Sequence, residues 1–178
     1  MLILLCMVVL KSLRRGLELR FLCVALAAHF LFLGEKMIIT FCGHSDYIQN
    51  SFDEEKILSI LEANTAYCQV DFYLGGYGNF DNFAYHCTKK YQALHPSARL
   101  IFITPYLLQR ETKQKYDEII YPSLENIPPK FALLHRNKWM IEHSDIVIAY
   151  VSRRFGGAYK SLTIAKHKNK QIFNIPEL

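Results

Sequence analysis

The chain has 178 residues, 51% of them hydrophobic, which is enough for one domain with a complete apolar core. Its formal net charge is +5, but residues 1–36 carry +3 of this and residues 37–178 only +2. A nearly neutral domain argues against a general polyanion-binding surface, although it leaves room for a local basic patch. On this ground the sequence argues against nucleic acid as a partner.

The five cysteines and seven histidines show no metal-binding pattern. They form no CxxC pair and no HxxxH or HExxH spacing, so we expect no metal site and no cofactor. An odd number of cysteines suits free thiols in a reducing compartment, which predicts a cytoplasmic location. Cys42 ends an apolar run and Cys87 lies on an apolar helical face, so both are expected in the core.

Residues 1–36 form a separate hydrophobic and basic extension. Its apolar stretches, Met1–Leu10 and Phe21–Leu33, are shorter than the roughly 18–20 residues that cross a bilayer as one helix. Three alternatives remain: a degenerate signal or interfacial anchor, a helix packed on the domain, or translation upstream of a natural start at Met37. We favour the third because the first strand pattern begins at Met37. We therefore expect residues 37–178 to form the domain, without a membrane as partner.

Five short apolar runs predict buried strands, and segments of helical periodicity separate most of them. After the first strand, Ser51 and Glu54 have the spacing of a capping box and predict the start of a helix. The stretch Tyr106–Lys130 shows no clear period, so we expect a surface loop there rather than a lid. The predicted strands are Met37–Cys42, Val70–Leu74, Arg99–Thr104, Asp145–Val151 and Gln171–Ile175.

Strands that alternate with helices predict right-handed crossovers and an α/β fold. The expected architecture is a Rossmann-like three-layer sandwich with a mainly parallel five-stranded sheet. Ligands of such folds lie beyond the carboxyl ends of the strands, where the strand order switches direction. The breaks after the first, second and fourth strands all contain glycine. Because a glycine pair that opens a helix lets backbone N–H groups approach an anion, Gly156 and Gly157 predict a phosphate or nucleotide site.

Several of these segments, in the correct order, resemble the short bacterial members of the SLOG superfamily. They are MIITFCGHS from Met37, FYLGGYGNFD from Phe72, RNKWMIEHSDIVIAYV from Arg136 followed by FGGA, and KQIFNI, which ends at Ile175. The superfamily joins the DNA-processing protein A fold to the Lonely Guy phosphoribohydrolases. The resemblance therefore implies a Rossmann-like domain that binds a nucleotide or a nucleotide-derived ligand, and it implies no particular reaction.

One part of the resemblance fails. Arg136 and Met140 match the Arg and Met of the R-K-x-x-M segment of the phosphoribohydrolases, and Gly156-Gly157 take the place of their P-G-G-x-G-T-x-x-E loop. Here the loop continues as AYKSLT without a carboxylate. The family's catalytic Glu is absent, so glycosidic-bond chemistry loses its acid–base group. The sequence favours a binding module without turnover, and no catalytic residue is predicted.

The predicted ligand site combines the three breaks with the segment around Arg136. His44 and Ser45 would donate hydrogen bonds, whereas Asp81 would accept from hydroxyl groups or cap its helix. The Arg136 guanidinium would bind phosphate or lie exposed on a helix, and Arg153 borders the site as a loop charge expected to be solvated. The predicted ligand-binding residues are Gly43, His44, Ser45, Gly75, Gly76, Gly78, Asp81, Arg136, Asn137, Gly156 and Gly157.

Three functions remain open. The leading one is a sensor or carrier that binds a nucleotide or nucleotide-derived small molecule. The second is a hydrolase or transferase in which Asp81, His44 or Asp46 supplies acid–base chemistry. The third is a single-stranded nucleic-acid-binding protein like the DNA-processing branch. The near neutrality of residues 37–178 speaks against it, because affinity for phosphates grows with the number of charges engaged. A homo-oligomer is compatible with each function.

Overall fold

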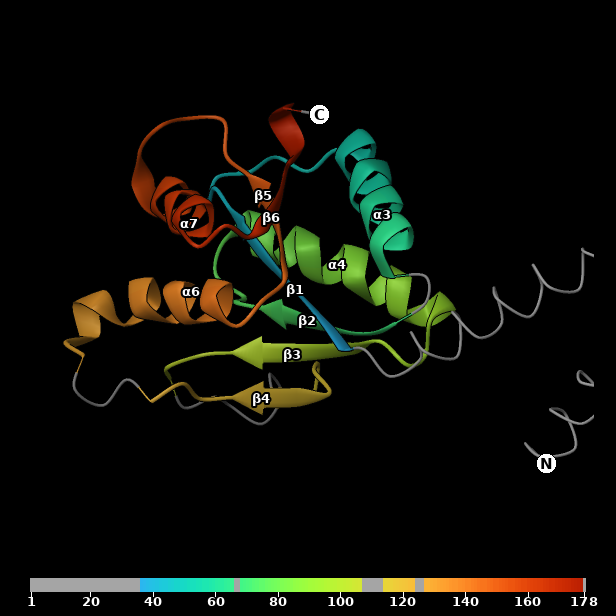
Figure 1. The fold of residues 1–178 in the computed structure, drawn as a ribbon, viewed down its shortest axis with the longest axis horizontal. Helices are drawn as coiled ribbons and strands as arrows, with labels where there is room; N and C mark the ends of the chain where they lie inside the picture. The colour runs from blue at the N-terminus through green and yellow to red at the C-terminus, as the bar shows by residue number, and fades with distance from the viewer. Residues whose placement is uncertain (1–35, 66–67, 107–113, 124–126, 178) are drawn as a thin grey trace, which may run out of the picture. The chain divides into compact units, whose positions relative to one another are not determined.

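A six-stranded parallel sheet lies at the centre of the described fold (Figure 1). The structure, a computed structural model, describes the residue ranges 36–65, 68–106, 114–123 and 127–177. Across the sheet the strands follow the order β4-β3-β2-β1-β5-β6, and each neighbouring pair is parallel. The strands are β1 (Lys36–Gly43), β2 (Gln69–Leu74), β3 (Arg99–Ile103), β4 (Glu118–Ile120), β5 (Ile146–Tyr150) and β6 (Gln171–Asn174).

The Rossmann-like class expected from the sequence is confirmed, but the predicted number of five strands is wrong. The sixth strand, β4, lies inside the stretch Tyr106–Lys130, for which the sequence predicted a surface loop. Its residues Ile119 and Ile120 pair with Phe102 and Ile103 of β3. A three-residue strand at the edge of the sheet is too short to show the apolar run by which buried strands are found.

Two pairs of helices cover the two faces of the sheet (Figure 1). Helices α3 (Ser51–Thr65) and α4 (Asn79–Leu94) pack on one face, and α6 (Ala132–Glu142) and α7 (Gly156–His167) on the other. The chain builds the sheet outward from β1 to β4 and then returns through α6 to β5, which lies beside β1. The direction of winding therefore reverses between β1 and β5, the position where ligands bind in doubly wound folds.

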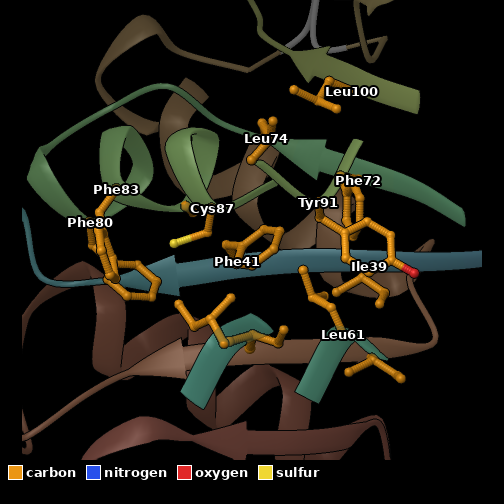
Figure 2. Close-up of a cluster of buried hydrophobic side chains, with 14 of the residues drawn as sticks. Ile39, Phe41, Leu61, Phe72, Leu74, Phe80, Phe83, Cys87, Tyr91 and Leu100 are labelled. Carbon is orange, nitrogen blue, oxygen red and sulfur yellow. The ribbon is translucent and has the colours of Figure 1, made fainter. Parts of the chain in front are cut away.

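Side chains that alternate along the strands divide the core into two layers. Ile39, Phe41 and Phe72 pack with α3 and α4, as Figure 2 shows, whereas Cys42 packs in the layer that contains α7. Both cysteines that the sequence predicted in the core, Cys42 and Cys87, are buried. Burial raises the pKa of each thiol to about 12, so both stay protonated at neutral pH.

The cap of helix α3 differs from the predicted capping box. Asn50, not Ser51, caps the helix: its Oδ1 accepts a hydrogen bond from the backbone N–H of Asp53 at 2.8 Å. The Asn50 Nδ2 donates in return to the Asp53 carboxylate, also at 2.8 Å. Glu54, the expected partner of Ser51, forms a salt bridge with Lys90 of α4 instead. The cap therefore lies one residue earlier than the sequence pattern indicated.

The extension predicted for residues 1–36 lies outside the described residues except for Lys36. Lys36 is the first residue of β1, one position before the predicted Met37, and its Nζ lies 2.5 Å from the buried carboxylate of Asp71. Within the described ranges, no helix combines the length and the apolar character needed to cross a bilayer.

Candidate functional site

A pocket of about 410 Å³ opens at the carboxyl ends of β1, β2 and β5. It lies at the predicted switch point in strand order, and its size is that of a small-molecule site. Nine of the eleven predicted residues line it, so the fold brings the three glycine breaks and helix α6 together. These nine are Gly43, His44, Ser45, Gly75, Asp81, Arg136, Asn137, Gly156 and Gly157.

Gly76 and Gly78 are the two predicted residues that do not line the pocket. Their φ angles are +62° and +104°, a backbone region that favours glycine. A Cβ on Gly76 would lie 2.4 Å from the ring of Phe102, and one on Gly78 would lie 2.8 Å from the Cα of Ser45. The turn geometry and this close packing account for both glycines without a ligand.

The first turn of α7 presents free backbone N–H groups to the pocket. Phe155 occupies the N-cap position without a side-chain hydrogen bond. The N–H groups of Gly156 and Gly157 have no hydrogen-bond acceptor among the described residues. A Cβ on Gly157 would meet no atom within 4 Å, so the space in front of this turn is open. An uncapped helix N-terminus beside open space suits an anion such as a phosphate.

His44, at the end of β1, is a neutral hydrogen-bond donor at this site. Its Nε2 accepts a hydrogen bond from the backbone N–H of Ser152 at 3.2 Å, so the neutral ring carries its proton on Nδ1. Burial lowers the pKa of His44, as does the charge of Arg153, while Asp46 raises it. His44 also lines the pocket, and its Nδ1–H has no acceptor among the described residues. Its donor role toward a ligand stays a prediction.

Arg153 lies at the rim of the pocket, and one of its nitrogens forms a hydrogen bond with a described residue. Its Nη2 donates to Asp46 Oδ1 at 2.6 Å, and its guanidinium lies over the Phe155 ring, 5.3 Å from the centroid. Its Nε is buried and has no hydrogen-bond partner among the described residues. A buried N–H without an acceptor is unfavourable. The sequence predicted only a solvated loop charge here.

Arg136 lines the pocket and also forms hydrogen bonds with the ends of two strands. Its side chain is buried, with 3% exposure, so the alternative of an exposed helix arginine is wrong. Nη1 donates to the carbonyl oxygens of Gly75 and Ile103, at the ends of β2 and β3. Nε donates to Oδ1 of Asn137 at 2.9 Å. Nη2 has no acceptor among the described residues, so one nitrogen remains available to a ligand.

Asp81, in the first turn of α4, is the acidic residue among those that line the pocket. Its Oδ2 accepts a hydrogen bond from the backbone N–H of Tyr77, in the turn before α4, at 2.7 Å, and no described side chain caps the N-terminus of this helix. Burial raises the pKa of Asp81 to about 6, and the Tyr77 N–H and the charge of Arg136 oppose this rise. The carboxyl group therefore titrates inside the pocket between mildly acidic and neutral pH.

We expect Asp81→Asn to stabilise the domain at pH 7 by about 1–3 kcal/mol. The folded-state pKa of about 6 exceeds the ordinary value of 3.8, so the folded state binds this proton more tightly than the unfolded state. The parent therefore loses stability as the pH rises through this interval, whereas asparagine does not titrate and still accepts from Tyr77. Urea unfolding should show the difference at pH 7 and its decline toward pH 4. An equal difference at both pH values would contradict the prediction.

Two exposed aromatic rings lie at the rim of the pocket. Tyr77 is 66% exposed and Phe155 is 67% exposed, and both line the pocket together with Lys130. An exposed flat ring at the rim of a pocket offers a stacking face. Phe155 and Lys130 are not among the site residues predicted from the sequence. The available signal for Phe155 was an aromatic residue directly before a glycine pair.

Comparisons with known proteins give a fold but no family. No family model matches the chain, and none of the curated proteins matches its sequence. Among solved structures, the fold is similar to DNA processing protein A from Helicobacter pylori, whose structure concerns its single-stranded DNA binding mode. The TM-score is 0.53 with 18% sequence identity, and the similarity covers 78% of this chain and 64% of that chain. This chain thus matches less than two thirds of that protein's length, and the likeness shows the fold alone.

The expectation that nucleic acid is not a partner is contradicted by this similarity, because the solved protein of similar fold binds single-stranded DNA. The net charge of residues 37–178 is an average over the domain, whereas binding depends on where the charges lie. In the structure, Lys130, Arg136 and Arg153 gather at the pocket. Two other basic side chains, those of Lys36 and Arg99, lie at the amino ends of the strands, where they pair with the buried carboxylate of Asp71.

Proposed function

We propose that this domain binds single-stranded nucleic acid and takes one nucleotide unit into the pocket. The observation that carries the proposal is the pairing of exposed aromatic rings, Tyr77 and Phe155, with the cationic side chains of Lys130 and Arg153 around one cavity. Proteins that bind single strands combine aromatic stacking platforms with a positively charged path for the phosphates. Both elements meet here at the carboxyl ends of the strands.

Unused hydrogen-bond donors at the pocket support a phosphate as the group that is bound. They are the N–H groups of Gly156 and Gly157 and the Nδ1–H of His44. A phosphate can accept from several of them at once, and hydrogen bonds to a charged acceptor are the stronger ones. The Nη2 of Arg136 would add a further donor from the floor of the pocket.

The similarity to DNA processing protein A supports the choice of a polymeric ligand. That protein binds single-stranded DNA, and its fold resembles this one. A pocket of about 410 Å³ has room for one nucleotide but not for several. A single strand would therefore place one nucleotide in the pocket and leave its neighbours on the surface.

A free nucleotide or nucleotide derivative is the second candidate, in a sensor or carrier without turnover. The observation that favours it is the polar floor of the pocket. Asn137 has its Oδ1 held by Arg136, which turns its Nδ2 toward the hydroxyl of buried Ser161 at 3.5 Å. Such a fixed amide could recognise a base or ribose.

Fluorescence anisotropy with a labelled twelve-nucleotide oligothymidylate tests the proposal. We expect saturable binding that weakens with salt, with a log–log slope of about −0.7 for each phosphate engaged. A duplex of the same length should compete poorly, because its bases are not free to stack. If the protein binds thymidine 5′-monophosphate but not the oligonucleotide, the second candidate replaces the first. Binding of neither would refute both.

A further inference from the structure

We propose that a bound single strand continues from the pocket into a second groove between α6 and α7, so that the binding site holds at least two consecutive nucleotides. This inference rests on the proposed function and adds a second site to it. The groove has a volume of about 440 Å³ and is lined by residues of both helices. None of the residues that the sequence analysis singled out as ligand-binding lines it.

The groove and the pocket share a wall. Leu134 of α6 lines both cavities. On α7, Gly157 and Ala158 line the pocket, and the next two residues, Tyr159 and Lys160, line the groove. A nucleic-acid strand whose phosphate lies at the first turn of α7 therefore needs to cross only this shared wall to bring its next nucleotide into the groove.

The chemistry of the groove fits a nucleotide better than it fits a protein segment of mixed charge. Its floor is formed by the apolar parts of Leu134, Tyr159 and Ile164, against which a base can lie. Lys138 and Lys160 are exposed and line the groove, and neither forms a salt bridge with a residue that the structure describes. No acidic side chain is found among the described residues that line it. An apolar floor beside two ammonium groups suits a base followed by its phosphate.

A second copy of this chain is the other occupant to consider, and the charges disfavour it. In a twofold contact through this groove, Lys138 and Lys160 of one copy would face the same lysines of the other. Like charges brought together in a desolvated contact oppose association. A polyanion meets the opposite condition, so the groove is assigned to the single strand.

The double variant Lys138→Ala/Lys160→Ala tests this assignment, with Lys89→Ala on α4, across the sheet, as matched control. The probes are the labelled twelve-nucleotide oligothymidylate and thymidine 5′-monophosphate. We expect the double variant to bind the oligonucleotide about tenfold more weakly near 50 mM salt, with a salt slope less steep by about 1.4, the contribution of two phosphates. Binding of the mononucleotide should stay within about twofold of the parent, because it reaches only the pocket. Lys89→Ala should leave the affinity for both ligands unchanged.

The possible failures are distinguishable. If the double variant binds the oligonucleotide with the parent's affinity and salt slope, the strand does not enter the groove, and the proposed function stands without this inference. An equal loss of affinity for the oligonucleotide and the mononucleotide would also contradict the assignment of the groove, since the two lysines would then act on the pocket. If the parent is a dimer by light scattering and the double variant a monomer, the groove is an interface between copies. A parent that binds no oligonucleotide removes the proposed function itself.

Discussion

Arg136→Ala is expected to lower the free energy of unfolding by about 3–5 kcal/mol. The buried guanidinium donates from Nη1 to the carbonyl oxygens of Gly75 and Ile103, and from Nε to Asn137. Alanine would leave both carbonyls without this donor and open a cavity beneath α6. Arg136→Lys should lose part of the same stability, because one ammonium group cannot reproduce the planar fork that reaches three acceptors.

Urea unfolding of the variant beside Arg153→Ala measures this effect. Arg153 carries the same side chain at the rim of the same pocket, but its side chain is 40% exposed and its salt bridge with Asp46 lies at the surface. We expect its removal to change stability by less than about 1 kcal/mol. If both variants lose equally little, Arg136 does not hold the strand ends together, and its importance would have to lie in ligand binding alone.

Gly157→Val is expected to weaken oligonucleotide binding at least about 100-fold, the loss of two hydrogen bonds to a charged group. The Cβ would point into open space, with no atom within 4 Å, in front of the uncapped N–H groups of α7. The branched side chain would then occupy the place proposed for the phosphate. Stability should change by less than about 1 kcal/mol, because valine has a helix propensity close to that of glycine or better.

Gly157→Ala provides the graded control. One methyl group should weaken binding less than valine does, while thermal unfolding should show a domain up to about 1 kcal/mol more stable, since alanine favours the helix over glycine. Anisotropy and thermal melting of the three proteins, done in parallel, separate the two effects. Binding by Gly157→Val as tight as the parent's would show that the glycine pair is only a turn and that the phosphate lies elsewhere.

Local patterns were sufficient to predict the class of fold and the position of the pocket. Five strands are mostly apolar runs, and glycines follow three of them, so both the parallel sheet and the edge at which the pocket lies could be predicted. Strand β4 was not predicted, because a three-residue strand at the edge of a sheet shows no recognisable hydrophobic pattern. Its existence depends on β3, which supplies the hydrogen-bonding partner.

Contacts between distant segments decided the rest, because a sequence pattern records only neighbours along the chain. Arg136 donates hydrogen bonds to carbonyl oxygens 61 and 33 residues away. A residue expected at the surface or at a ligand is therefore buried and connects the ends of two strands. Glu54, expected to close a local capping box, pairs instead with Lys90, 36 residues further on. The net charge of residues 37–178 was misleading for the same reason. It does not report where the charged side chains lie, whereas the electrostatic field at a phosphate depends on which charges the fold brings to one edge of the sheet.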